Sequence, residues 1–130
     1  MPEHVHMVVL PTTSEYDISR FLSTLKGSVA RRAVAFVRRH APEFLPRMTD
    51  LQPNGKRCIR FWQRGGGYDR NLWEPRYIWE MIDYIHANPV RRGLCARPEQ
   101  WPWSSARDYL GLGPGDLIID RHSLPDDPRP

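Results

Sequence analysis

The chain carries at residues 75–89 the stretch PRYIWEMIDYIHANP, which decides how the fold is read. Its isoleucines recur at the spacing of one helical face, and its first proline suits a helix start. We therefore predict an amphipathic helix that begins at residue 75 and is ended by Pro89. Tyr77, Tyr84 and Asn88 fall on a stripe beside the isoleucine face, with Asn88 one turn beyond Tyr84. A phenol and a carboxamide thus point the same way.

Two histidines, His4 and His6, lie near the start of the chain in the run MPEHVHMVVL. The pattern over residues 4–10 predicts a strand with both histidines on one face. Side chains two apart on a strand share a face, so two imidazoles there can hold one metal ion. Paired histidines near a chain start occur more often as solvent-facing residues. Tyr84, far along the chain, favours the metal-site interpretation over the solvent-facing one.

His4, His6, Tyr84 and Asn88 together predict a site that cleaves a phosphodiester. Neutral imidazoles and a carboxamide oxygen leave the charge of a divalent ion largely uncancelled, so the ion can stabilise charge that develops on the phosphoryl oxygens. Tyr84 then attacks phosphorus, and the tyrosyl ester conserves the bond energy for rejoining. We expect Mg²⁺ or Mn²⁺, although paired histidines also suit Zn²⁺. Taken singly, Tyr84 also suits a packing helix, and Asn88 a helix end before proline.

Five motifs follow one another along the chain: MPEHVH (1–6), ISRFLSTLKG (18–27), FWQRG (61–65) with YDR (68–70), YIHANPVRRGL (84–94) and WPWSSARDY (101–109). In this order they resemble the REP-associated tyrosine transposases, a group within the single-tyrosine HUH transposases. The resemblance implies an α+β fold, with a ferredoxin-like antiparallel sheet and helices packed on one face. It also implies a reaction that joins a tyrosine to a 5′ phosphate of single-stranded DNA, usually near a hairpin, and frees a 3′ hydroxyl.

The same resemblance implies a role for each site residue. His4 and His6 match the HUH metal ligands, Tyr84 the nucleophile, and Asn88 the polar position that completes the metal site. Such proteins carry an additional strand, helix and strand ahead of the HUH strand, whereas Met1 lies three residues before His4. We therefore expect a catalytic domain at residues 1–113 that is incomplete at its N-terminus, and a loosely ordered tail at residues 114–130. We also expect the locus to encode the absent segment upstream of the Met1 codon.

The charge balance favours a nucleic-acid partner. Arginine outnumbers lysine 17 to 2 in a chain of net charge +4. The balance becomes +6 without residues 115–130, because four aspartates and two arginines lie there. Guanidinium groups suit forked contacts with phosphate. GC-rich coding sequence also favours arginine, so composition alone leaves both explanations open.

Three segments carry the predicted DNA contacts. A helix over about residues 14–39, capped by Ser14, has no acidic residue from Arg20 through Arg39. A loop at residues 40–57 leads through an Asn-Gly turn into a strand at about 57–63, where a tryptophan lies among cations as in single-strand binders, or else packs in the core. A basic turn follows the Tyr84 helix. The predicted contacts are Arg20, Arg31, Arg38, Arg60, Trp62, Gln63, Arg64, Arg91 and Arg92.

Several further predictions concern packing and location. A short helix should run from a Ser104 cap to about Leu110, with Trp101 and Trp103 over the core. We expect His86 to face DNA or solvent. The two cysteines, Cys58 and Cys95, should be reduced and structural. No apolar run is long enough to cross a membrane and no signal peptide is evident, so we expect a cytoplasmic protein.

The sequence therefore predicts a metal-dependent enzyme that cleaves and rejoins single-stranded DNA. Two alternatives stay open: a catalytically inactive DNA-binding remnant or domesticated regulator, and an unrelated metal phosphoesterase that uses water instead of Tyr84. The expected partner is single-stranded or hairpin DNA. REP-associated members are thought able to work singly, whereas an exposed strand edge here leaves pairing with a second copy, as a homodimer, open.

Overall fold

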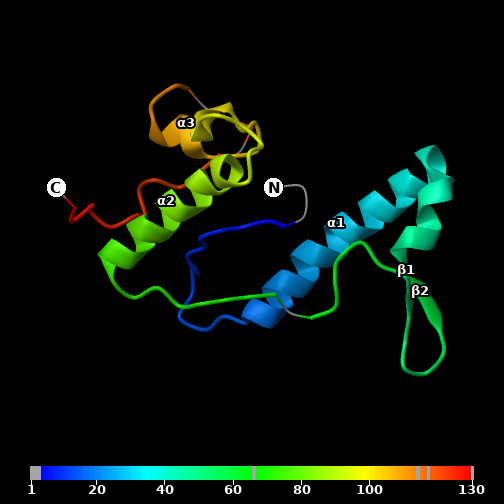
Figure 1. Ribbon diagram of the computed structural model, residues 1–130. Coiled ribbons are helices and arrows are strands. Elements are labelled where there is room, and N and C mark those ends of the chain that lie inside the picture. The colour runs from blue at the N-terminus through cyan, green and yellow to red at the C-terminus, as the bar shows by residue number, and fades with distance from the viewer. Residues whose placement is uncertain (1–3, 66, 114, 117, 130) are drawn as a thin grey trace. The chain divides into compact units, whose positions relative to one another are not determined.

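The computed structural model describes residues 4–65, 67–113, 115–116 and 118–129 (Figure 1). The chain divides into two compact units. One joins the residues up to Thr12 to those from Arg70 onward, and the other is the continuous segment Thr13–Asp69. The domain limits expected from the resemblance, 1–113 and 114–130, stay a prediction.

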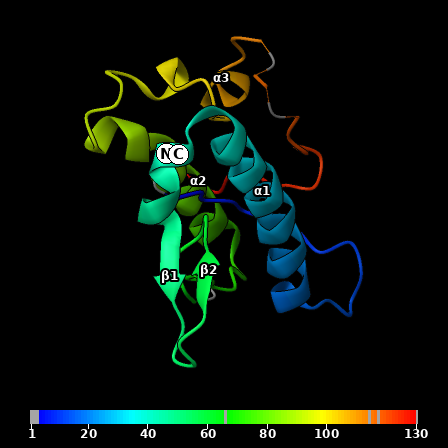
Figure 2. The ribbon, with the colours of Figure 1, turned by 90° about the vertical axis from the view of Figure 1, so that its right-hand side faces the viewer.

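The segment Thr13–Asp69 consists of one long helix followed by a hairpin. Helix α1 spans Ile18–His40, and a 3₁₀ helix, η1, spans Pro42–Met48. Strands β1 (Thr49–Leu51) and β2 (Arg57–Ile59) pair antiparallel, with Asp50 opposite Cys58 (Figure 2). The Asn-Gly turn between them is confirmed, and Gly55 has a φ of 77°, a conformation that glycine adopts without steric cost.

Three sequence predictions for this segment need correction. The cap of α1 is Asp17, which accepts a hydrogen bond from the Arg20 backbone N–H at 3.0 Å, and not Ser14. Residues 40–57 are not one loop, because the prolines at 42 and 46 are accommodated in η1. The second strand is shorter than the predicted 57–63.

The other unit is built around helix α2, Pro75–Arg91. Contrary to the prediction, Pro89 does not end this helix. A proline in the last turn removes one hydrogen bond, but the Arg92 backbone N–H still donates to the Asn88 carbonyl at 3.1 Å, and Gly93 closes the turn with a φ of 68°. The 3₁₀ helix η2 spans Pro98–Gln100. The predicted short helix is present as α3, Ala106–Tyr109, but its N-cap residue is Ser105 and not Ser104, although the Ser104 hydroxyl accepts from the Ala106 N–H at 3.2 Å.

Residues 4–10 do not form the predicted strand. In the part of the chain that the structure describes, the sheet consists of β1 and β2 alone. A strand needs a neighbour to satisfy its backbone N–H and C=O groups, and residues 4–10 have none there. The α+β class is confirmed, as helices with a two-stranded antiparallel sheet.

The tail after residue 113 contains no helix or strand among its described residues, yet it contacts α2 and α3. The Trp79 indole N–H donates to the Pro125 carbonyl at 3.1 Å. Arg129 forms ion pairs with Asp83 and Asp127 and lies over the Trp79 ring. Among the described helices, none is long and apolar enough to cross a membrane.

Candidate active site

The predicted metal ligands and nucleophile lie close together in one unit. The His4 and His6 rings are 4.6 Å apart between centroids, and the His6 and Tyr84 rings are 5.9 Å apart. The Asn88 amide nitrogen lies 2.9 Å from His6 Nε2. Residues 4–10 thus run beside α2 without strand pairing, and Figure 1 shows this segment in blue and α2 in green. All four residues that the sequence predicted for the site are brought together.

Helix α2 determines how its two site residues are presented. Tyr84 and Asn88 are four residues apart, so they lie on adjoining turns of one face. Asn88 is polar and yet buried, with 7% of its surface exposed, whereas Tyr84 is 43% exposed. A buried carboxamide needs a hydrogen-bond partner, and His6 supplies it. The phenol remains accessible to a large substrate.

His6 is neutral in this arrangement. An amide nitrogen only donates hydrogen bonds, so this contact fits a neutral His6 ring in which Nε2 accepts and the proton is on Nδ1. Burial lowers the pKa of His6 below 6.5, and the neighbouring His4 lowers it further. A neutral imidazole is the form that binds metal ions, but its one free lone pair here faces the Asn88 amide nitrogen, so this hydrogen bond has to break before His6 can ligate an ion.

The residues present fit a divalent metal ion only if Asn88 takes part. Among the described residues, no three His, Cys, Asp or Glu side chains gather closely enough to hold a metal. Two imidazoles with the Asn88 amide oxygen would give three neutral donors. At present the Asn88 amide nitrogen faces His6. A half-turn of the amide group about the Cβ–Cγ bond would bring the oxygen to the same place, which is a small rearrangement for an Asn side chain. Three donors of this kind would leave open positions for substrate, and the expected Mg²⁺ or Mn²⁺ stays a prediction, since paired imidazoles also suit Zn²⁺.

A cation accompanies the candidate nucleophile. The Arg91 guanidinium carbon lies 5.2 Å from the centre of the Tyr84 ring, within cation–π range. Arg91 follows Tyr84 by seven residues on α2, so both lie on the same face. Arg92 occupies the adjoining C-cap position. The predicted basic turn is thus beside the site.

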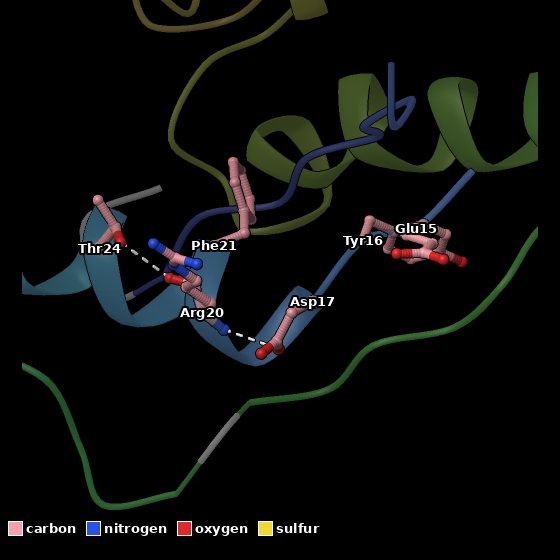
Figure 3. Close-up of a pocket in the computed structure, with 6 residues that line it drawn as sticks. All are labelled: Glu15, Tyr16, Asp17, Arg20, Phe21 and Thr24. Atoms are coloured by element: carbon pink, nitrogen blue, oxygen red, sulfur yellow. Dashed lines mark hydrogen bonds between the residues drawn. The ribbon is translucent and has the colours of Figure 1, made fainter. Parts of the chain in front are cut away.

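The remaining predicted DNA contacts belong to the segment Thr13–Asp69. Arg20, Arg31 and Arg38 are exposed along α1. Arg20 also lines a shallow depression at the start of α1, together with the exposed aromatic side chains Tyr16 and Phe21 (Figure 3). Their contact with DNA stays a prediction.

Around the hairpin, several predicted DNA contacts have partners in the protein. Arg60 and Arg64 both form ion pairs with Asp50, the latter at 2.8 Å. The Trp62 indole N–H donates to the Lys26 carbonyl at 2.9 Å, which agrees with the packing alternative for this tryptophan. Gln63 is exposed.

His86 is a structural residue that the sequence analysis misjudged. Its Nε2 lies 2.9 Å from the Ser105 hydroxyl and its ring lies 5.0 Å from that of Tyr109, so it is half-buried against these residues instead of facing solvent freely, and a contact with DNA stays a prediction. Burial lowers its pKa, against an opposing effect of Asp83. The missed signal is that His86 follows the buried Ile82 by four residues.

Two further packing predictions can be checked. Trp101 is half-buried, but Trp103 is 68% exposed and does not cover the core as predicted. Cys58 and Cys95 are both free thiols, as expected.

Comparison of the chain with protein-family models, with curated proteins and with solved structures gave no match in any of the three. A functional assignment therefore depends on the quoted motifs and on the geometry around Tyr84.

Proposed function

We propose that the chain is a metal-dependent, single-stranded DNA strand transferase of the tyrosine transposase type. The observation that carries this proposal is the convergence of His4, His6 and Asn88 on one another and on Tyr84. The two histidines and the two α2 residues are some eighty positions apart in sequence, so local structure does not account for their meeting. An exposed phenol beside a guanidinium is also suited to a polyanionic substrate.

In the proposed reaction, the Tyr84 hydroxyl oxygen attacks phosphorus. The bond from phosphorus to the 3′ oxygen breaks, and the new bond is a 5′-phosphotyrosine. The phenol loses a proton to solvent and the leaving 3′ oxygen gains one, so the step is balanced. Arg91 is placed to attract the phosphate towards the phenol. Rejoining is the reverse attack by a 3′ hydroxyl.

His4, His6 and Asn88 would hold the divalent ion, Mg²⁺ or Mn²⁺. When bound, such an ion supplies positive charge that stabilises the phosphoryl oxygens and the leaving 3′ oxygen. The three ligands add no negative charge of their own, which keeps that stabilisation strong. Before the ion binds, the Asn88 amide nitrogen holds the His6 ring through its contact with Nε2, and this contact would be given up when both side chains ligate the ion.

A labelled DNA hairpin with a single-stranded flank tests the proposal. With Mn²⁺ present, we expect a covalent protein–DNA band on a denaturing gel that is lost in Tyr84→Phe and retained in Tyr16→Phe. Tyr16 is an exposed tyrosine outside the site and controls for loss of a phenol elsewhere. Cleavage that survives Tyr84→Phe would instead indicate a phosphoesterase that uses water. Binding without any cleavage would indicate the DNA-binding remnant.

The remnant is the second candidate, and one observation favours it. His4 and His6 lie on a segment without strand pairing, and a catalytic metal site tolerates little looseness in its ligands. The ferredoxin-like sheet is likewise a proposal, since it requires residues 4–10 to pair as a strand. Slow hydrogen exchange at the amides of residues 4–10 in solution would support that pairing, and rapid exchange would count against it.

A further inference from the structure

Helix α2 and the loop before it repeat one arrangement twice. Arg70, Tyr77, Tyr84 and Arg91 are spaced seven residues apart. The Arg70 guanidinium carbon lies 5.9 Å from the centre of the Tyr77 ring, and that of Arg91 lies 5.2 Å from the Tyr84 ring. Two turns of helix separate the tyrosines, about 10.5 Å along the axis and about 20° around it. They therefore share one face of α2.

Both tyrosine rings remain accessible although each has an arginine over it. Tyr77 is 45% exposed and Tyr84 is 43% exposed. An aromatic ring beside a guanidinium is the combination by which proteins bind single strands, because the ring stacks on a base while the cation contacts phosphate. Arg70 and Tyr77 have no part in the proposed cleavage chemistry, so their arrangement calls for another explanation.

The charge around this face also suits a DNA strand. The two acidic residues of α2 are Glu80 and Asp83. Glu80 forms an ion pair with Arg76 at 2.8 Å, and Asp83 forms one with Arg129. Both carboxylates are thus compensated by cations, which reduces their repulsion of phosphate. A polyanion can therefore approach the tyrosine face.

We propose that Arg70 and Tyr77 form a second nucleotide subsite, which binds an unpaired nucleotide of the strand whose phosphate meets Tyr84. The base stacks on Tyr77, and Arg70 contacts an adjacent phosphate. The separation of about 10.5 Å corresponds to about three phosphate spacings of a B-form strand, and to fewer when the strand is extended. This inference rests on the proposed function, which it deepens by assigning a flanking nucleotide to a particular pair of residues.

Binding of single-stranded DNA to the full chain tests the subsite without requiring cleavage. A fluorescent 12-nucleotide strand without a hairpin is titrated in the absence of divalent ions, and anisotropy gives the Kd. We expect Tyr77→Ala to weaken binding about tenfold, and Tyr77→Phe, which keeps the ring, to bind within about twofold of wild type. Arg70→Ala should reduce the slope of log K against log salt by about 0.7, the value for one phosphate contact.

Arg97→Ala is the matched control for Arg70→Ala. It removes the same charge from an exposed arginine that pairs with Glu99 at η2 and does not belong to the Arg70–Tyr77 or Arg91–Tyr84 pairs. We expect this variant to leave the salt slope unchanged. Equal slopes for Arg70→Ala and Arg97→Ala would overturn the assignment of Arg70.

A scan with single abasic nucleotides separates stacking from a structural effect. Wild type should lose affinity about tenfold when the base that stacks on Tyr77 is removed, and Tyr77→Ala should show no such loss at that position. If Tyr77→Ala does not fold by circular dichroism, Tyr77→Leu gives the same comparison with an apolar, non-aromatic side chain. An abasic profile that is the same in wild type and in the folded variant would overturn the subsite.

The covalent assay distinguishes this inference from the function on which it rests. A Tyr84 adduct together with unaltered binding by Tyr77→Ala would remove the subsite and leave the proposed function. Binding that depends on Tyr77 but yields no adduct with Mn²⁺ would keep the subsite and remove the cleavage reaction. Binding of no single-stranded DNA by wild type would overturn the subsite directly.

Discussion

At the scale of single residues, the contact with Asn88 bears on the protonation and the ring orientation of His6. The Asn88 amide nitrogen lies 2.9 Å from Nε2, which fits a neutral imidazole whose ring is held in place before any ion binds. Burial of Asn88 keeps water from replacing this contact. The contact between Asn88 and His6 would have to break for the Asn88 amide oxygen to become a metal ligand. Metal binding would therefore change what holds the His6 ring.

Substitution of His6 should therefore weaken binding of a divalent ion. We expect His6→Ala to lower the affinity for Mn²⁺ at least about tenfold in calorimetry, because one of the three donors is lost. His40→Ala is the matched control, since His40 stacks on Phe36 at the end of α1 and belongs to the other unit. Equal Mn²⁺ affinity for both variants would contradict the assignment of the metal ligands.

The Tyr84 side chain carries the second prediction at this scale. Tyr84→Phe should keep the ring contacts with His6 and Arg91 while removing the attacking oxygen. We expect unchanged thermal stability together with complete loss of the covalent DNA adduct. A large drop in melting temperature would instead indicate that the hydroxyl has a structural role.

At the element scale, the two long helices were predictable from the sequence. Apolar residues at helical spacing predicted α1 and α2 because that spacing is local information. The exact ends were less predictable. Asp17 and Ser14 are both good caps, and only tertiary context selects between them. A proline near a C-terminus removes a single hydrogen bond, so α2 continues past Pro89 to Arg91.

Helix α2 should depend on its buried isoleucine. Ile82 is 5% exposed, and Ile82→Ala should reduce the free energy of unfolding by about 2 kcal/mol or more in urea titration, through lost burial and a cavity. Ile118, which is fully exposed, offers the control. We expect Ile118→Ala to change stability by no more than about 0.5 kcal/mol. Similar effects of the two substitutions would show that α2 is not packed as described.

The hairpin should show a pH dependence of known sign. The hydrogen bond from Arg64 lowers the pKa of Asp50 below 3.8, and Arg60 lowers it further. A carboxyl whose pKa is depressed by folding stabilises the fold above the unfolded pKa, and that stabilisation is lost as the pH falls through the folded pKa. We expect the carboxyl resonance of Asp50 to titrate below 3.8, and to move upward in Arg64→Ala. Titration of wild type at or above 3.8 would contradict the ion pairs.

At the scale of the whole molecule, the site was easier to predict than the fold around it. The chemistry of His4, His6, Tyr84 and Asn88 is a property of residue types, and these four residues do converge. Strand formation at residues 4–10 depends on a pairing partner elsewhere in the chain, which periodicity alone does not reveal. The position of His86 depends on Ser105 and Tyr109, which contact it from a separate segment.

The tail provides a test of where the catalytic unit ends. If residues 1–113 formed a complete domain, removal of residues 114–130 would leave its stability unchanged. The Trp79 indole N–H donates to Pro125, and Arg121 lies over the Tyr109 ring, so truncation removes contacts with both α2 and α3. We expect truncation after residue 113 to lower the free energy of unfolding by about 2 kcal/mol, of which about 1 kcal/mol is the net value of the hydrogen bond and the remainder belongs to the two arginines that lie over rings.

Arg129→Ala in the full chain separates the contributions within the tail. It removes the ion pair with Asp83 and the guanidinium over the Trp79 ring, but leaves the Trp79 hydrogen bond in place. We therefore expect it to be less destabilising than the truncation when both are measured by urea titration of tryptophan fluorescence. Because truncation removes both the hydrogen-bond partner of Trp79 and the guanidinium over its ring, the emission should shift further to the red in the truncated chain than in Arg129→Ala. If truncation changes neither stability nor emission, residues 114–130 lie outside the folded unit and the domain limit at residue 113 is correct.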